Sequence, residues 1–396
     1  MMNEQPIYFD NAATSWPKPR ETIDAITRFG ECVGANPGRS GHSMSVQAAR
    51  EVLDTRDSLS QLFHVDDMLR IVFTRNATEA LNLVFSGLLK DGDHVITSSM
   101  EHNSVMRPLR RRESQGVELT VVRCSDTGMI DPDDVRAAIR PGTRMIVITH
   151  ASNVTGTIMP ISDIGAMARE HGCIFCVDAA QTAGSVNIDV QEMKIDLLAF
   201  TGHKALFGPQ GTGGLYIGPD LENEVQPLVI GGTGSMSEFE HQPDFLPDKY
   251  ESGTPNAMGI AGLGAGVRFL LKLGLYEVTS READLREQLV QGLEDIPGVT
   301  VYGSKESGSS IANVSFTIES IRPSDVTLAL DEHYAVMSRP GLHCAPSAHR
   351  TIGTFPQGTV RLSLGYFNTS DQVRYVLQAV SEVAAGTMGK RAGKKP

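Results

Sequence analysis

Residues 145–149 read MIVIT, a near-continuous apolar run of the kind found in strands that are covered on both faces. The run lies within a longer β-rich segment, 144–150, and similar segments occur along the chain at 70–74, 94–98, 119–123, 173–178, 197–201 and 214–217. Helix-like segments, such as 79–89, 132–139 and 161–170, separate most of them. This alternation predicts an α/β fold in which helices flank a mostly parallel, seven-stranded sheet.

The pattern changes in the last third of the chain. A long helical stretch extends from residue 255 to about 293, and a β-α-β pattern follows, with segments at 311–318, 324–333, 334–337, 360–364 and 370–383. This predicts a second, smaller α+β domain. We expect a large domain at 14–263 and a small domain that combines 1–13 with 264–396.

The composition limits the classes of partner and compartment. A net charge of -12 argues against binding to nucleic acid or to an anionic membrane, because both need a positive face. No apolar run reaches about 18 residues, and the N-terminus lacks a secretory pattern. Five scattered cysteines do not form a disulfide framework. We therefore expect a cytoplasmic protein.

Polar side chains follow several of the predicted strands, where open α/β sheets bind their ligands. Taken singly, a lysine is usually a solvated charge and a strand-end aspartate is usually a helix cap. Thr78 falls at a predicted helix start, where free backbone N–H groups suit a phosphate. The full set is Thr78 in TRNATEALN, His102 in MEHNS, Asn153 in ASNVTG, Asp178 and Gln181 in VDAAQTAG, and Thr201, His203 and Lys204 in FTGHKALFGPQGTGG.

Together these residue types meet the needs of one cofactor, pyridoxal phosphate. That cofactor requires a lysine to bind it covalently, a carboxylate to keep its pyridine nitrogen protonated, and hydroxyl and amide groups around its phosphate. A flat histidine that stacks on the ring completes the set. We therefore predict a pyridoxal-phosphate site at the carboxyl ends of the strands, and no metal site.

Several motifs resemble those of one enzyme family. The most specific is VDAAQ followed by TGHK, in which Lys204 comes 26 residues after Asp178 (204 − 178). YFDNAATS near the start and VRLSLGYFNT near the end extend the similarity over nearly the whole chain. In these motifs the chain resembles the cysteine desulfurases of the class V aminotransferase family, which are fold type I pyridoxal-phosphate enzymes.

The resemblance implies roles for the matching residues. Lys204 would bind the cofactor covalently, Asp178 would pair with its pyridine nitrogen, and His102 would stack on its ring and handle protons. The family pattern assigns the remaining positions as follows: Ala77, Thr78, Thr201 and His203 around the phosphate; Gln181 and Asn153 near the phenolic oxygen and the substrate; Arg361 at the substrate α-carboxylate; and Arg339 and Asn11 elsewhere in the substrate site.

The segment YESGTPN, residues 250–256, resembles the part of these enzymes that reaches the phosphate site of the neighbouring subunit. The resemblance implies a homodimer in which Thr254 makes that contact. It also implies L-cysteine, or L-selenocysteine, as substrate and a sulfur-acceptor protein as partner.

Cys344 lies in the Pro- and Gly-rich stretch SRPGLHCAP, residues 338–346. Free cysteines are mostly buried small apolar residues, and this interpretation suits the other four. The pattern Arg339-x-Gly341-x-His343-Cys344, however, resembles the RxGxHC loop of group II desulfurases and selenocysteine lyases, whose catalytic loop is short. The resemblance implies that Cys344 attacks the substrate sulfur and carries it as a persulfide.

Other interpretations of the cysteines are weaker. Cys173 and Cys176 are spaced like a redox pair, but they lie in an apolar strand where positions i and i+3 point to opposite faces. A zinc site at His343, Cys344 and His349 has no usual ligand spacing.

Three alternative functions remain at this stage. A selenocysteine lyase depends less on Cys344, an ordinary class V aminotransferase needs no loop cysteine, and a scaffold that only binds the cofactor needs no complete catalytic set. The segments GLHCAPSAHRTIG and ANPGRSGH depart from the well-known group II enzymes and indicate a distinct subfamily. The sulfur acceptor therefore cannot be named from the sequence.

Overall fold

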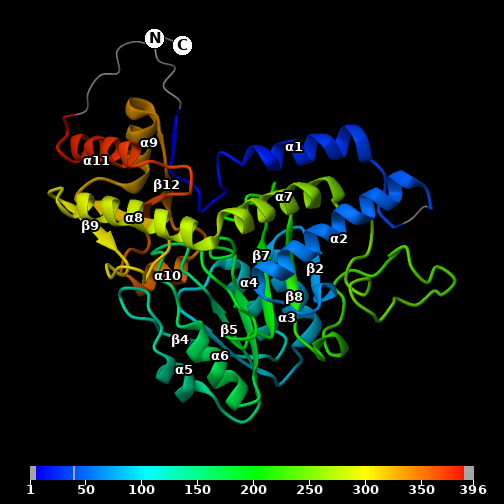
Figure 1. Cartoon of the computed structure of the whole chain (residues 1–396). Helices are drawn as coiled ribbons and strands as arrows, with labels where there is room; N and C mark the ends of the chain where they lie inside the picture. The colour runs from blue at the N-terminus through cyan, green and yellow to red at the C-terminus, as the bar shows by residue number, and fades with distance from the viewer. Residues whose placement is uncertain (1–5, 39–40, 388–396) are drawn as a thin grey trace.

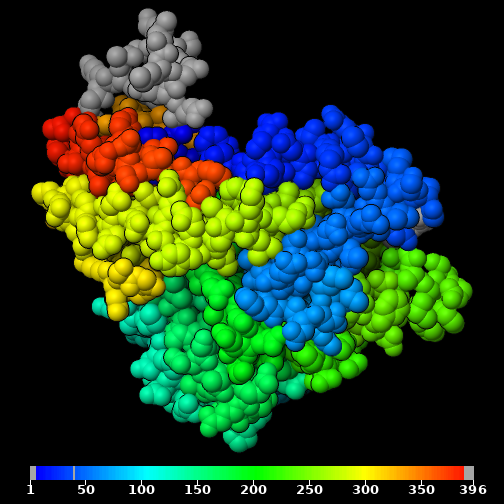
Figure 2. Space-filling view, viewed as in Figure 1, coloured from blue at the N-terminus to red at the C-terminus, as the bar shows by residue number. Residues whose placement is uncertain are grey.

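The computed structural model describes residues 6–38 and 41–387 (Figure 1). Residues 39 and 40 of the ANPGRSGH motif, and residues 1–5 and 388–396 of the expected small domain, lie outside this description. A large α/β part and a smaller α+β part pack together, with α7 (Ala257–Leu273) and α8 (Leu275–Glu294) forming a band that runs across both (Figure 2).

The large part is built on a seven-stranded sheet, and the predicted α/β class is confirmed. The strand order is β2-β8-β7-β6-β5-β3-β4, and β8 alone runs antiparallel to its neighbours. All seven predicted strands are present, with ends that differ by no more than one residue from the prediction. Their bounds are β2 (Ile71–Thr74), β3 (His94–Ser98), β4 (Glu118–Val122), β5 (Thr143–Thr149), β6 (Ile174–Asp178), β7 (Leu197–Thr201) and β8 (Gly213–Ile217).

Helices cover both faces of this sheet, which explains why its strands are apolar throughout. Ile146 and Ile148 of the MIVIT run belong to the core on one face, whereas Met145 and Val147 belong to the core on the other. The first face packs against α2 (Ser43–Phe63), α5 (Pro132–Ala138), α6 (Ile161–Glu170) and α7, and the second packs against α3 (Ala77–Leu88) and α4 (Asn103–Glu113).

The smaller part has its own core and an antiparallel sheet in the order β12-β13-β10-β9. N-terminal strand β1 (Ile7–Tyr8) pairs with β11 (Val336–Met337), so the first described residues pack with this part. The remaining elements are α1 (Arg20–Arg28), β9 (Val299–Tyr302), β10 (Asn313–Ile318), α9 (Pro323–Tyr334), β12 (Arg339–Gly341), α10 (Pro346–Thr351), β13 (Thr359–Ser363) and α11 (Ser370–Ala384), with short helices at Phe29–Val33, Met68–Arg70 and Leu221–Asn223.

The expected domain boundaries, after residues 13 and 263, remain predictions, and the second lies inside α7. The predicted helical stretch from residue 255 is two helices, α7 and α8, which meet at Gly274 with a bend of 84°. Gly274 has a φ of 88°, a conformation that favours glycine. Among the described residues, no single helix is long and apolar enough to cross a membrane. Taken together, the two helices of this bent pair have that length and apolar composition.

Candidate active site

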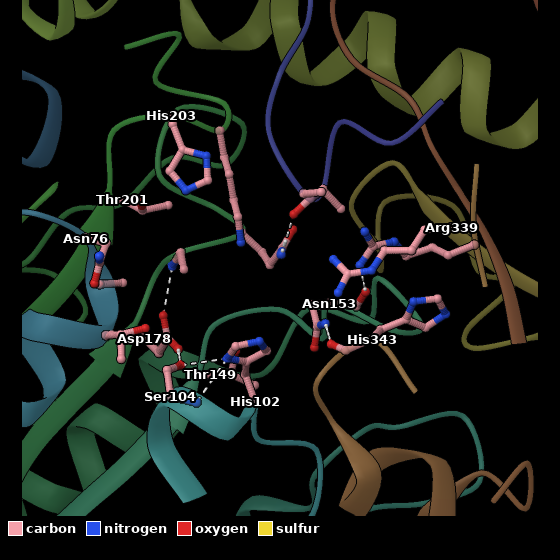
Figure 3. Close-up of a pocket in the computed structure, with 18 residues that line it drawn as sticks. Asn76, His102, Ser104, Thr149, Asn153, Asp178, Thr201, His203, Arg339 and His343 are labelled. Atoms are coloured by element: carbon pink, nitrogen blue, oxygen red, sulfur yellow. Dashed lines mark hydrogen bonds between the residues drawn. The ribbon is translucent and has the colours of Figure 1, made fainter. Parts of the chain in front are cut away.

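A cavity of about 310 Å³ lies at the carboxyl ends of the sheet strands, where the smaller part closes over the large one (Figure 3). Its size suits a small-molecule ligand. The loops after β2, β3, β5, β6 and β7 supply one wall, and β12, β13 and the N-terminal segment supply the other. The lining residues are Ala12, Ala13, Asn76, Ala77, Thr78, His102, Ser104, Thr149, Asn153, Asp178, Ala180, Gln181, Thr201, His203, Lys204, Arg339, His343 and Arg361.

Most of the residues singled out in the sequence line this one cavity, although they come from seven separate segments. Three do not. Cys344 is exposed beside it, Thr254 is exposed on the segment before α7, and Asn11 lines a smaller neighbouring cavity of about 40 Å³. The Asn11 amide is already engaged, since it donates to the Ser363 carbonyl and to Asn368 Oδ1 and accepts from Trp16 N–H.

Lys204 follows β7 and reaches into the cavity. Burial lowers its pKa to about 8; the charge of Asp178 opposes this shift, whereas Arg361 and Arg339 add to it. A lysine in this state is partly neutral near pH 8, and a neutral amine can attack a carbonyl group.

Asp178 ends β6 and is buried, at 3% exposure. Its Oδ1 accepts a hydrogen bond from Ala180 N–H at 2.9 Å, and its Oδ2 accepts one from the Ser104 hydroxyl at 3.4 Å. Burial raises the pKa of this carboxyl group, and the Ala180 N–H and the charge of Lys204 oppose that shift. A buried carboxylate with a cationic neighbour is a suitable partner for a protonated ring nitrogen.

His102 is the N-cap residue of α4, and its Nδ1 accepts a hydrogen bond from Ser104 N–H at 3.0 Å. Burial lowers the pKa of His102 to about 4, and the charges of Lys204 and Arg339 push it the same way. The ring is therefore neutral at physiological pH, which suits stacking on an aromatic ligand.

At one end of the cavity, unpaired polar groups form a cradle for an anion. Ala77 and Thr78 begin α3, whose first backbone N–H groups point outward from the helix. Thr201 Oγ1 and His203 Nδ1 are buried without a hydrogen-bond partner. Buried polar atoms are normally satisfied, so these two indicate space for a ligand with acceptor oxygens. With Lys204 and Asp178 farther along the cavity, the residues present fit pyridoxal phosphate.

At the opposite end, Arg361 is 1% exposed. Its Nη2 pairs with Asp10 Oδ1 at 2.8 Å, its Nη1 donates to the Asn153 carbonyl at 3.0 Å, and its Nε has no partner. Such a fixed guanidinium suits a substrate carboxylate. Asp10, which lies within YFDNAATS next to Asn11, was not predicted from the sequence, yet it orients the guanidinium.

Cys344 lies in the loop between β12 and α10, next to His343. Both residues have positive φ angles, 48° for His343 and 59° for Cys344, which are unfavourable for residues with side chains. The loop is held in place because Asn153 Nδ2 donates to the His343 carbonyl at 2.7 Å and Asn103 N–H donates to the Cys344 carbonyl at 2.8 Å. Arg339 Nη2 lies 3.7 Å from Cys344 Sγ. A cation that lines the cavity therefore also contacts the sulfur.

The expectation that the other four cysteines are buried is wrong for Cys32, which is exposed, and holds for the remaining three. Cys124, Cys173 and Cys176 are buried, and burial raises the pKa of each. All five are free thiols, and no group of three or more potential metal ligands occurs in the described part of the chain.

Comparison with known proteins places this geometry in a family. A sequence model of the class V aminotransferases matches residues 7–376. The chain is 34% identical to a probable cysteine desulfurase of Methanothermobacter thermautotrophicus (96% of this chain, 94% of the relative) and 33% identical to one of Pyrococcus abyssi (96% and 95%).

Comparison with solved structures also finds cysteine desulfurases. The apo structure of a cysteine desulfurase from Thermococcus onnurineus matches with a TM-score of 0.91 and 34% identity, covering 96% of this chain and 95% of that one. The cysteine desulfurase CsdA from Escherichia coli matches with a TM-score of 0.86 and 28% identity, covering 97% and 96%. The similarity is thus continuous from the first strand to the last helix. The chain belongs to the class V aminotransferase family, whose members depend on pyridoxal phosphate.

Proposed function

We propose that this protein is a pyridoxal-phosphate-dependent cysteine desulfurase, which converts L-cysteine to L-alanine and retains the sulfur as a persulfide on Cys344. The observation that carries the proposal is the convergence of Lys204, Asp178 and the Cys344 loop on one cavity. The similarity to cysteine desulfurases over 96% of the chain supports it.

When bound, pyridoxal phosphate supplies an electron sink for the electrons released at the substrate Cα. The residues of the chain do the remaining work. The Lys204 amine would hold the cofactor covalently and would move the proton at the substrate Cα. Asp178 would hold the charge at the pyridine nitrogen, the α3 N-terminus would hold the phosphate, and Arg361 would bind the substrate carboxylate.

Cys344 is the nucleophile in the step that removes sulfur from the substrate. Its thiolate attacks the substrate sulfur, so that one S–S bond forms while the substrate Cβ–S bond breaks. The electron pair of the broken bond stays with Cβ, which takes up a proton, and the products are L-alanine and Cys344–S–SH. The atoms balance without an external oxidant or reductant. Arg339 lies beside the sulfur and can pair with the attacking anion.

Incubation with L-cysteine and a reductant tests the proposal. The reductant regenerates the thiol, so alanine and sulfide should form in equal amounts over many turnovers. Alanine formation from L-selenocysteine at a much higher rate than from L-cysteine would favour the selenocysteine lyase alternative. Amino transfer to a keto acid without sulfide would instead indicate an ordinary aminotransferase.

Attachment of pyridoxal phosphate to Lys204 should become faster with rising pH and level off above about pH 8. Only the neutral amine attacks a carbonyl, and burial lowers the Lys204 pKa from 10.5 to about 8. Well below pH 8 the rate should therefore rise about tenfold per pH unit. Timed addition of the cofactor followed by borohydride trapping and mass spectrometry measures this rate. A rate that continues to rise to pH 10 would contradict the lowered pKa.

We also propose a homodimer in which Thr254 of each subunit contacts the phosphate site of the other. The segment before α7 exposes a group of apolar side chains, and such groups mark interfaces. It stands out from the large part beside α2 (Figure 2). Leu228 of this segment also lines a cavity of about 750 Å³ that includes Thr78 of the anion cradle and the adjacent Asn76. The exposed apolar residues are Leu228, Val229, Ile230, Met236, Phe239 and Phe245.

Ile230→Asp should convert the dimer to a monomer and weaken the binding of pyridoxal phosphate. Ile230 is 72% exposed, and a carboxylate at a buried interface position would be desolvated without a partner. Analytical ultracentrifugation measures the mass and cofactor titration measures the affinity. Tyr276→Asp is the control, since Tyr276 is 84% exposed on α8, away from this segment. A wild-type protein that sediments as a monomer while fully active would refute the proposed dimer.

A sulfur-acceptor protein is part of the proposal. A persulfide on an exposed loop residue is accessible to a second protein, and Cys344 is exposed.

A further inference from the structure

Ser104 was not among the residues predicted from the sequence, yet it contacts two of the most important of them (Figure 3). It is the second residue of α4, lines the cavity and is 6% exposed. Its hydroxyl oxygen lies 2.8 Å from His102 Nδ1 and 3.4 Å from Asp178 Oδ2. A single hydroxyl thus connects the histidine expected to stack on the cofactor with the carboxylate expected to pair with the cofactor's ring nitrogen.

The backbone of Ser104 decides which nitrogen of His102 carries the proton. Ser104 N–H donates to His102 Nδ1 as the N-cap hydrogen bond of α4. An imidazole nitrogen that accepts a hydrogen bond has its lone pair free and bears no proton. The proton of the neutral ring is therefore on Nε2, the nitrogen that no helix cap occupies. Burial lowers the pKa of His102 to about 4, in agreement with a neutral ring.

The hydroxyl proton has two competing acceptors. Because Nδ1 carries no proton, the hydroxyl can donate either to it or to Asp178 Oδ2, and it has only one proton to give. Asp178 Oδ1 is already held by Ala180 N–H, and the Ser104 hydroxyl can reach the second carboxylate oxygen when it does not donate to His102. A change in the charge on Asp178 will then change the hydrogen bond that reaches His102.

We propose that Ser104 is a positioning residue, whose one hydroxyl proton is shared between two acceptors, His102 Nδ1 and Asp178 Oδ2, and so couples the two side chains. Its backbone N–H keeps the proton of His102 on Nε2. The inference deepens the proposed function and rests on it, because it assumes that both side chains contact pyridoxal phosphate. Ser104 itself acts only through its two neighbours.

Ser104→Ala removes the hydroxyl but keeps the backbone N–H. We expect the visible absorption band of the bound cofactor to shift, because Asp178 loses a donor. We also expect kcat for L-cysteine to fall about tenfold while KM changes less than about threefold, as for the loss of one buried hydrogen bond that orients reacting groups. Ser104→Thr, which keeps the hydroxyl, should recover most of the activity and the wild-type band.

Ser114→Ala is the matched control. Ser114 is the C-cap residue of the same helix, and its hydroxyl donates only to the Arg111 carbonyl, at 2.7 Å, on the surface. This variant should match the wild type in spectrum and kinetics. If Ser104→Ala lowers only the thermal stability and leaves the band, kcat and KM as in Ser114→Ala, the positioning role is refuted.

A measurement on the wild type covers the case in which Ser104→Ala does not fold. Nitrogen NMR of the full-length, cofactor-loaded protein labelled with ¹⁵N-histidine should show an unprotonated Nδ1 and a protonated Nε2 for His102. His102→Asn identifies the resonance by its loss and keeps an N-cap acceptor. A protonated Nδ1 in the wild type would overturn the inference. Wild-type protein that binds no pyridoxal phosphate would instead refute the proposed function.

Discussion

Cys344→Ser should retain bound pyridoxal phosphate and its colour, yet release sulfide from L-cysteine at least about 10³-fold more slowly than the wild type. The cofactor cavity is lined by other residues, so its geometry does not depend on this side chain. A serine hydroxyl cannot accept sulfur as a persulfide, so the step that removes sulfur has no nucleophile. Sulfide assay and cofactor absorption, measured on the same preparation, separate the two effects.

Cys32→Ser is the matched control for this variant. Cys32 is the other exposed free cysteine among the described residues, and it lies in the short helix after α1. It should lose no activity. Turnover of L-selenocysteine by Cys344→Ser should be reduced less, because selenium leaves more readily than sulfur. Sulfide release by Cys344→Ser at the wild-type rate would show that Cys344 is not the nucleophile.

Lys204→Ala should lose both the covalently bound cofactor and the activity, by at least about 10³-fold. Lys204 is the lysine that lines the cavity, and its lowered pKa provides the neutral amine that the attachment needs. Pyridoxal phosphate can still enter the anion cradle at the start of α3, so weak non-covalent binding should remain. Borohydride treatment followed by peptide mass spectrometry should find the cofactor on Lys204 in the wild type and on no peptide of the variant.

Lys272→Ala serves as the control for the loss of a lysine. Lys272 is exposed near the end of α7 and does not line the cavity. Cofactor content and activity should equal those of the wild type. Covalent cofactor at normal levels in Lys204→Ala would mean that another lysine, such as half-buried Lys18, binds it. Lys18 is the alternative to examine because its Nζ lies 2.7 Å from the His203 carbonyl and burial lowers its pKa to about 8.

The large sheet was predictable because its strands are short, apolar and buried on both faces. MIVIT and its counterparts carry that signal within a few consecutive residues, and their ends place Asp178 and Lys204 at the same edge of the sheet. The edge strands β9 and β12 of the smaller sheet were not predicted. Their residues are half-buried or exposed, so no apolar run marks them. Amphipathic α2 was missed as well, since its surface side carries many polar residues.

The site was predictable where a residue follows a strand, and not where its role depends on a distant partner. Asp10 orients Arg361 although the two residues are 351 positions apart in the sequence, and no local sequence pattern predicts that pairing. Ser104 was overlooked beside His102 because a serine near a helix start is ordinarily a cap. Its importance comes from the approach of Asp178, 74 residues later. The strained backbone of His343 and Cys344 likewise depends on contacts with Asn153 and Asn103.

Mass spectrometry of the cofactor-loaded protein after a single turnover with L-cysteine, in the absence of reductant, tests the central claim most directly. The proposed mechanism predicts one L-alanine per active site and one added sulfur atom on the Cys344 peptide, with none on the peptides that contain Cys173 or Cys176. Alanine without added sulfur on Cys344, or added sulfur on another cysteine alone, would contradict it.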